Sequence, residues 1–232
     1  MFKLNVDELN GDALHAFSFA HNTKPTLATE TLFNALMPAG KPFELEQGKT
    51  HYLSPDRESA GIILFEHGIC SICHVGNDLF ISSMFSPAIL GLIDGYSVFY
   101  EVPSRPQHYL YAETLCYGKF VALNDFVRIC DEQNLWHDVA RILAHRLMVM
   151  SAREEELLGV DSYLKVRTLL IELNAYPEEY RLQIQVLNFI QRRTNISRSR
   201  VMAILSELRK GEYITIDNGK LIAIEQKLPA AF

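Results

Sequence analysis

Six basic residues gather near the C-terminal end of the chain, and their chemistry points to phosphate binding. Between Arg192 and Lys210 they are accompanied by one acidic residue, Glu207. The six are Arg192, Arg193, Arg198, Arg200, Arg209 and Lys210. The whole chain has a net charge of −6, yet residues 161–232 carry 11 basic and 8 acidic residues. A basic segment on an acidic chain indicates a phosphate-binding surface, with a solvated structural helix as the alternative.

The basic residues lie in a stretch whose pattern predicts helix, tight turn, helix and hairpin. Asn195 suits the left-handed backbone of a sharp turn, and Ser197 suits the N-cap of a second helix. In that helix apolar residues recur at i, i+3, i+4 and i+7, which predicts one buried stripe ending near Gly211. The stripe consists of Val201, Ile204, Leu205 and Leu208. Asn218-Gly219 then predicts a hairpin, and the order is that of a winged helix-turn-helix, which places its second helix in the DNA major groove.

The outward face of this second helix is the expected DNA contact. Successive residues turn by about 100°, so the apolar stripe fixes which side chains point away from the protein. Arg198 can bind a guanine bidentately, whereas Arg192 and Arg193 are better placed for phosphates. The predicted DNA-binding residues are Arg192, Arg193, Thr194, Asn195, Ser197, Arg198, Ser199, Arg200, Met202, Ala203, Ser206, Lys210 and Lys220.

The first half of the chain has a different pattern, because its apolar residues alternate from residue 41 onward. Many short strands separated by turn residues predict a sandwich or barrel. The expected strands are 42–46, 49–53, 60–66, 70–75, 79–83, 96–101, 108–113 and 119–123, with a helical turn at 86–91. Helices are expected at 26–36 and, capped by Asn124, at 125–133, whereas residues 1–24 are predicted to form a poorly specified arm.

A long helix is expected over residues 135–158. Apolar side chains recur in it every seven residues, so it either packs on its own β domain or pairs with its copy in a second subunit. Pairing is favoured because winged helix-turn-helix proteins usually read two half-sites as dimers. The predicted dimer interface is Trp136, Val139, Leu143, Leu147, Met150 and Leu157. The expected domains are a sensor-like domain at 1–134, a dimerisation helix at 135–159 with a hinge at Gly159, and a DNA-binding domain at 160–232.

This order resembles the Crp–Fnr superfamily of bacterial transcription regulators, over roughly residues 40–224. The sharpest match is the segment 196–205, where Ser197, Arg198, Val201, Ile204 and Leu205 stand at the family's positions. The resemblance implies an α+β fold with an N-terminal cyclic-nucleotide-binding-like β-roll, a long dimerisation helix and a C-terminal winged helix-turn-helix. It also implies a homodimer that binds double-stranded DNA, with RNA polymerase as a further candidate partner.

Two details refine this resemblance. Arg198 stands where the family often reads a guanine, but Ser199 and Ala203 depart from the family's pattern, so the familiar operator sequence is not expected. Within the superfamily the chain is similar to the divergent enterobacterial IprA/YaiV-type regulators. That subgroup is linked to oxidative-stress resistance, which implies the same link here.

Cyclic-nucleotide binding is not expected. The nucleotide-binding members of the superfamily hold the cyclic phosphate with a Gly-Glu pair and an Arg followed by a small residue. The equivalent region, residues 76–104, contains no Lys or Arg but does contain Asp78, Asp94 and Glu101. Carboxylates in such a pocket would repel a phosphate, which needs a guanidinium or a helix N-terminus.

The remaining candidate chemistry is weak. The four cysteines, Cys70, Cys73, Cys116 and Cys130, are expected to be small buried hydrophobes, with a reactive thiol among them as the alternative. The histidines show no metal-ligand spacing, so neither a metal nor a cofactor is expected.

The sequence contains none of the common catalytic motifs, so no catalytic residue is proposed and an enzyme is not expected. Without a signal peptide or an apolar run of about 20 residues, the expected compartment is the cytoplasm. The rival interpretation is a protein-interaction adaptor whose degenerate winged helix no longer binds DNA.

Overall fold

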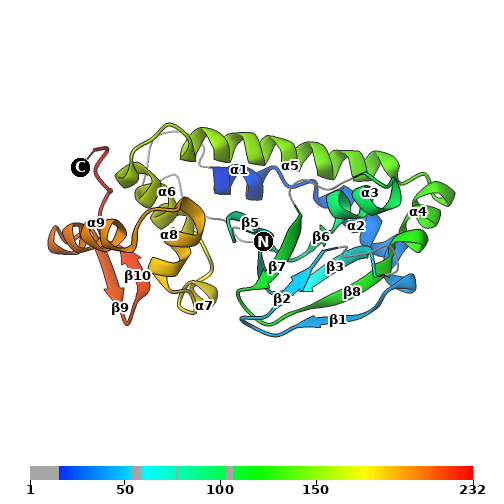
Figure 1. Cartoon of the computed structure of the whole chain (residues 1–232), viewed down its shortest axis with the longest axis horizontal. Helices are drawn as coiled ribbons and strands as arrows, with labels where there is room; N and C mark the ends of the chain where they lie inside the picture. Colours follow the sequence, from blue (N-terminus) through cyan, green and yellow to red (C-terminus); the bar gives the residue numbers. More distant parts are fainter. Residues whose placement is uncertain (1–15, 54–58, 77, 103–106, 232) are drawn as a thin grey trace. The chain divides into compact units, whose positions relative to one another are not determined.

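The computed structural model describes residues 16–53, 59–76, 78–102 and 107–231, which form two compact units (Figure 1). Residues 25–144 belong to one unit, and residues 145–231 together with 16–24 belong to the other. The long helix α5 (Trp136–Leu157) therefore begins in the first unit and ends in the second. Most of the predicted N-terminal arm, residues 1–15, lies outside the described residues.

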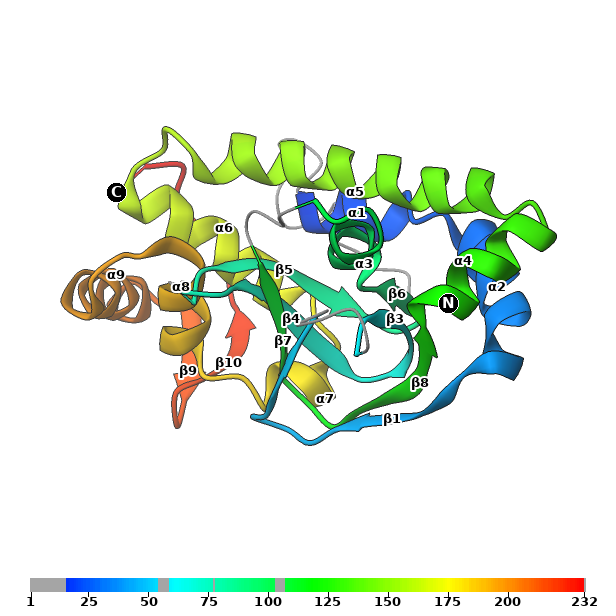
Figure 2. The ribbon, with the colours of Figure 1, turned by 45° about the vertical axis from the view of Figure 1, so that its right-hand side comes forward.

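The first unit contains two four-stranded sheets in which all paired strands are antiparallel (Figure 2). One sheet has the order β1 (Lys41–Leu45), β8 (Cys116–Ala122), β3 (Gly61–His67) and β6 (Ala88–Leu90). The other has the order β2 (Thr50–Tyr52), β7 (His108–Ala112), β4 (Ile69–His74) and β5 (Phe80–Phe85). The predicted β-roll is therefore confirmed.

Strand β3 lies at the centre of this unit, between β8 and β6, and it is buried on both faces. Successive side chains of a strand point to opposite sides of the sheet. Ile63 and Phe65 pack into the cluster formed by residues of both sheets. Ile62 and Leu64 pack into a second cluster with α2 (Thr26–Leu36), α4 (Leu123–Glu132) and the first turns of α5. This arrangement explains why residues 62–65 are all apolar and do not alternate with polar residues.

Two predicted elements of the first unit are wrong. Residues 88–90, expected in a helical turn, form strand β6, which pairs with β3. Residues 96–99, expected in a strand, lie in α3 (Leu92–Phe99), which starts after Gly91 turns the backbone at φ 89°. Short apolar runs carry no signal that separates a buried strand from a buried helix, so pairing with β3 decides between them.

A smaller correction concerns the helix after β8. Helix α4 begins at Leu123, after Ala122 at the cap position, so Asn124 is not its cap. The expected helix at 26–36 is confirmed as α2, and a short 3-10 helix, η1 (Met37–Ala39), follows it.

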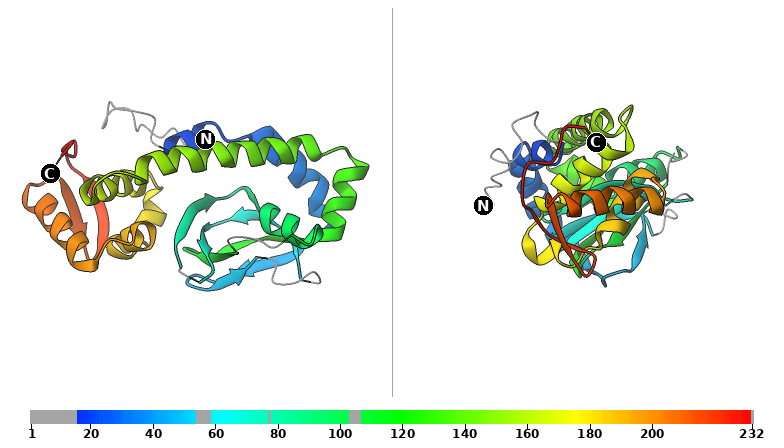
Figure 3. Two further views of the ribbon diagram at one scale, coloured as in Figure 1. Left: turned by 45° about the horizontal axis from the view of Figure 1, so that its top comes forward. Right: turned by 90° about the vertical axis from the view of Figure 1, so that its left-hand side faces the viewer.

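The second unit is a winged helix-turn-helix with a helix of the arm beside it (Figure 3). Its elements besides α5 are α1 (Ala16–Asn22), α6 (Ser162–Asn174), α7 (Glu178–Arg181), α8 (Val186–Thr194), α9 (Arg198–Lys210), β9 (Ile214–Asp217) and β10 (Lys220–Ile224). Asp161 caps α6 by accepting a 2.9 Å hydrogen bond from the Leu164 N–H. Across the described parts of both units, no helix is long and apolar enough to span a lipid bilayer.

Candidate nucleic-acid interface

The turn between α8 and α9 is built by the residues that the sequence singles out. Asn195 has the left-handed backbone, at φ 55°, and its N–H donates to the Gln191 carbonyl over 3.2 Å. The Thr194 hydroxyl donates to the Ile190 carbonyl over 2.8 Å. Ser197 caps α9 by accepting a 3.3 Å hydrogen bond from the Arg200 N–H. These local bonds fix where the second helix begins, and they hold Thr194 inside the turn.

Helix α9 has one buried face and one open face. The four residues of the predicted stripe, Val201, Ile204, Leu205 and Leu208, are all buried. The residues predicted to face outward are all exposed, namely Ser199, Met202, Ala203, Ser206 and Lys210, and so are Arg198 and Arg200, which flank that face. Arg198 and Arg200 stand in the first turn, where the helix dipole is positive and adds to their charge.

The C-terminal end of α9 has weaker electrostatics. The Lys210 ammonium lies 2.7 Å from a Glu207 carboxylate oxygen, and both side chains are largely exposed. An exposed pair of this kind stabilises a helix little, but it partly neutralises the charge that Lys210 offers to a phosphate. The first turn of α9 is therefore the strongest basic feature of the exposed face.

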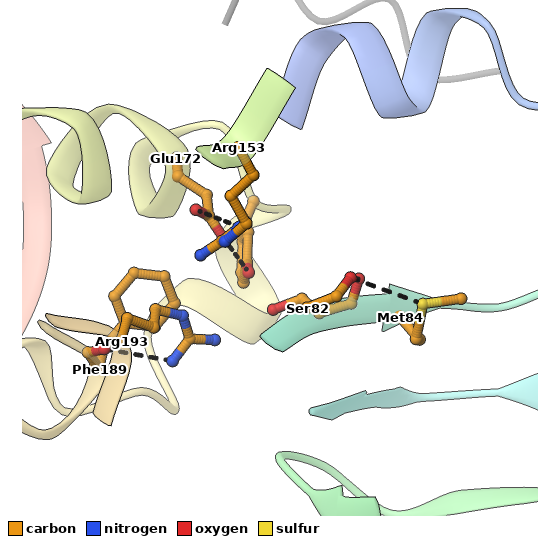
Figure 4. A network of polar contacts seen from close by, with 8 residues as sticks. Ser82, Met84, Arg153, Glu172, Phe189 and Arg193 are labelled. Atoms are coloured by element: carbon orange, nitrogen blue, oxygen red, sulfur yellow. Dashed lines mark hydrogen bonds and ion pairs between the residues drawn. The ribbon is translucent and has the colours of Figure 1, made fainter. Parts of the chain in front are cut away.

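Arg193 is not where the sequence prediction puts it. Its side chain is only 5% exposed, and its guanidinium carbon lies 3.6 Å from the centre of the Phe189 ring (Figure 4). One guanidinium nitrogen donates to the Phe189 carbonyl over 3.2 Å. The expectation that Arg193 contacts phosphate is therefore corrected: its group packs inside the helix-turn-helix. Arg192, beside it, is half-buried.

The wing is a tight hairpin tied to the start of α8. Asn218 and Gly219 both have positive φ, 47° and 78°, as a type I′ turn requires. The Gly219 carbonyl accepts a 3.0 Å hydrogen bond from the Val186 N–H. Lys220, a predicted DNA contact, donates to the Gln183 carbonyl over 2.7 Å, so its ammonium is held against the protein.

The predicted dimer seam on α5 divides into two parts. Val139 is buried in its own chain's hydrophobic cluster, and Leu143 packs against the same cluster. Leu147 and Met150 are 66% and 45% exposed, with Trp136 at 40% and Leu157 half-buried. Val139 and Leu143 thus stabilise the β unit, whereas Trp136, Leu147 and Met150 leave apolar surface exposed.

The segment 76–104, in which the sequence resemblance predicts the phosphate loop, carries a buried acid. Asp94, on α3, is 5% exposed, and one of its oxygens lies 3.1 Å from Nδ1 of His108. A carboxylate held in this place disfavours a phosphate ligand. Among the residues that the structure describes, no three His, Cys, Asp or Glu side chains are grouped to hold a metal ion.

The four cysteines are buried thiols, as the first of the two sequence interpretations expects. Burial raises the pKa of Cys116 to about 11, and burial followed by the charge of Asp131 raises the pKa of Cys130 to about 12. Both therefore remain protonated near neutral pH, and a protonated thiol is a poor nucleophile. The alternative of a reactive thiol finds no support in this geometry.

Comparison with known proteins agrees with this architecture. Residues 162–230 match the family model described as winged helix-turn-helix DNA binding. The chain is 31% identical over 210 residues to the Salmonella typhimurium protein named inhibitor of hydrogen peroxide resistance, covering 90% of this chain and 98% of that protein.

Solved structures share the fold at low sequence identity. One is the c-di-GMP responsive global regulator CLP of Xanthomonas campestris, with a TM-score of 0.68 and 13% identity, covering 85% of this chain and 100% of that one. Another is a protein of Eubacterium rectale described as a regulator of the crp/fnr family, with a TM-score of 0.69 and 12% identity, covering 89% and 96%. The first half of the chain, with its β-roll, is thus included in the likeness.

Proposed function

We infer the function from the premise that this chain belongs to the family of the bacterial protein named inhibitor of hydrogen peroxide resistance. It has the Crp/Fnr fold, with a cyclic-nucleotide-binding-like domain and a winged helix-turn-helix. We propose that it is a sequence-specific DNA-binding transcription regulator, and that it takes part in the response to oxidative stress. The oxidative-stress part of the proposal is supported by the name of the relative.

The observation that carries the DNA-binding part is the open face of α9. This face presents the Arg198 and Arg200 side chains in the first turn, with Ser199, Met202 and Ala203 exposed beside them. A basic, capped helix N-terminus suits phosphate and base-edge contacts in the major groove. The opposite face is buried, so α9 can offer only this side to a partner.

Measuring DNA binding against salt concentration tests the proposal. The full chain, added to a fluorescently labelled random duplex pool, is expected to bind with an affinity whose logarithm falls linearly with the logarithm of salt concentration. Selection from the same pool should return a sequence with two related half-sites. An adaptor with a degenerate wing would show neither the steep salt dependence nor an enriched sequence, and that result would refute the proposal.

We also propose that the β-roll acts without cyclic nucleotide. The acidic Asp94 and the absence of any Lys or Arg from residues 76–104 support this. Titration calorimetry with cyclic AMP and cyclic GMP is expected to give no heat of binding at micromolar protein. A dissociation constant in the micromolar range would contradict the proposal, whatever the outcome of the DNA experiment.

The other parts of the proposal follow from DNA binding. The protein would work as a homodimer in the cytoplasm, where bacterial DNA lies, and would not catalyse a reaction. RNA polymerase is a candidate further partner, because one way in which a DNA-bound regulator changes transcription is by contacting it. The crosslinking of purified polymerase to the DNA-bound protein would test that contact.

A further inference from the structure

Tyr176, which follows α6, is the point where several segments of the second unit meet. Its side chain is buried, and its hydroxyl donates to a Glu172 carboxylate oxygen over 3.1 Å. Its ring lies edge-on to Phe189 of α8, with 5.8 Å between ring centres. Phe17 of the arm helix α1 lies against the same ring, at 5.2 Å between centres. One side chain thus touches α1, α6 and α8.

Glu172 connects this point to the long helix α5. It is 2% exposed, and its second carboxylate oxygen lies 3.3 Å from a guanidinium nitrogen of Arg153, near the end of α5 (Figure 4). Burying both charges costs desolvation energy that their attraction does not reliably repay. Losing one partner leaves the other charge buried and uncompensated. Such a pair is weak evidence for added stability, but it strongly favours one relative position of α5 and α6.

The covalent link between the two helices does not supply that position. Gly159 stands between α5 and α6 with φ 73°, and a Cβ built on it would meet no atom within 4 Å. A side chain at this position would therefore gain no packing contact, and a glycine has more backbone freedom than other residues. Side-chain contacts such as Arg153–Glu172 must then hold the direction of α5 relative to the helix-turn-helix.

The same contacts lead on to the recognition helix. Phe189, which Tyr176 touches, lies under the Arg193 guanidinium, and Arg193 stands two residues before the turn residue Asn195. On the other side, the arm runs back to α5, where the Thr23 hydroxyl lies 3.1 Å from Nε2 of His145. These side-chain contacts, together with the backbone of the arm and of the turn, therefore join the end of α5, the arm and the turn before α9.

We propose that Arg153, Glu172 and Tyr176 are positioning residues that fix the direction of α5 relative to α9. If α5 pairs with its copy in a dimer, this direction sets the distance between the two recognition helices, and so the half-site spacing that the dimer reads. The effect on half-site spacing rests on the proposed function, whereas the positioning of α5 concerns a single chain and does not.

A distance measurement between two spin labels tests directly whether these residues fix the direction of α5 relative to α9. The labels are attached to cysteines introduced by Glu155→Cys on α5 and Ser206→Cys on α9, both exposed positions, while the four native thiols are buried. Labelled protein is diluted with unlabelled protein so that each distance lies within one chain. The otherwise wild-type chain is expected to give one narrow distance distribution. Glu172→Gln, which keeps the shape but removes the charge, is expected to broaden or shift it.

Controls separate positioning from unfolding. Glu178→Gln makes the same chemical change at an exposed residue and should leave the distribution narrow. Should Glu172→Gln fail to fold, Arg153→Gln serves instead, because Arg153 is partly exposed at 17%. The double variant should be no broader than either single one, since residues that act as a pair are not additive. A folded Glu172→Gln or Arg153→Gln with an unchanged narrow distribution would overturn the proposal.

A second measurement, of DNA binding, tests whether these residues set the half-site spacing that the dimer reads. Inserting one base pair between the half-sites of the selected duplex is expected to cost the wild type about tenfold in affinity, about 1.4 kcal/mol. On the same insertion, the Glu172→Gln protein should lose distinctly less affinity than the wild type. The Glu178→Gln protein should lose the same factor of about ten. Equal losses in all three proteins would refute the role in spacing. If the wild type binds no DNA, the proposed function fails, and the distance measurement still decides the positioning role.

Discussion

Replacing Arg198 by alanine is expected to weaken binding to the selected duplex by about 1–3 kcal/mol and to relax the preference at one base position per half-site. Arg198 is exposed in the first turn of α9, directly after the capping Ser197. A guanidinium there can donate two hydrogen bonds to the O6 and N7 atoms of guanine. The neighbouring Met202 and Ala203 can only touch a thymine methyl group, so we expect Arg198 to carry most of the direct base recognition.

Arg209→Ala is the matched control for this prediction. It removes the same charge at the other end of α9, where the side chain is also exposed. Fluorescence anisotropy with the selected and a scrambled duplex, at several salt concentrations, measures both variants. Arg209→Ala should weaken the two duplexes alike, whereas Arg198→Ala should weaken the selected duplex more. If Arg198→Ala also weakens both equally, Arg198 contacts only phosphate and the proposed placement of α9 is wrong.

The second large effect is expected from Leu147→Asp, which should convert the proposed dimer into a monomer. Leu147 is 66% exposed on α5, so the change should spare the fold of the single chain. In a paired helix it would bury a carboxylate in each subunit, and an unpaired buried polar group costs about 1–3 kcal/mol. Leu143 is a poorer choice, because it packs against its own chain's hydrophobic cluster.

Sedimentation velocity measures this result, and Met148→Asp is its matched control. Met148 is 52% exposed and is adjacent to Leu147, but about 100° round the helix and away from the predicted seam. The Met148→Asp protein should remain dimeric. The Leu147→Asp protein should sediment as a monomer and should lose affinity for the duplex with two half-sites. A Leu147→Asp protein that stays dimeric would place the dimer interface on another surface.

The elements predicted most closely are those specified by local backbone chemistry. Asn195, Ser197 and the Asn218-Gly219 turn act through their own backbone or residues within three positions, and the structure places all of them as expected. Strand β6 and helix α3 were mispredicted because partners distant in sequence decide their conformation. Nothing in the sequence pairs Arg153 with Glu172 either, since the two residues lie on different helices.

Arg193 is a different case, because a local signal was present. Phe189 and Arg193 are four residues apart on one helix, the spacing at which side chains meet. An arginine over an aromatic ring is a common contact, and it withdraws the charge from solvent. The guanidinium of Arg193 therefore packs on Phe189 and is not offered to a phosphate.

Strand β3 is buried on both faces in the folded protein, but it is exposed while the chain is being synthesised. Its sheet partners, β6 and β8, both come later in the sequence. Ribosomes add about 5–20 residues per second, so β3 leaves the ribosome seconds before β8 exists to cover it. During that time a run of four large apolar residues, Ile62 to Phe65, is open to pairing with other chains. A segment that is fully buried in the folded protein is thus exposed during synthesis, when a chaperone that covers it would prevent such pairing.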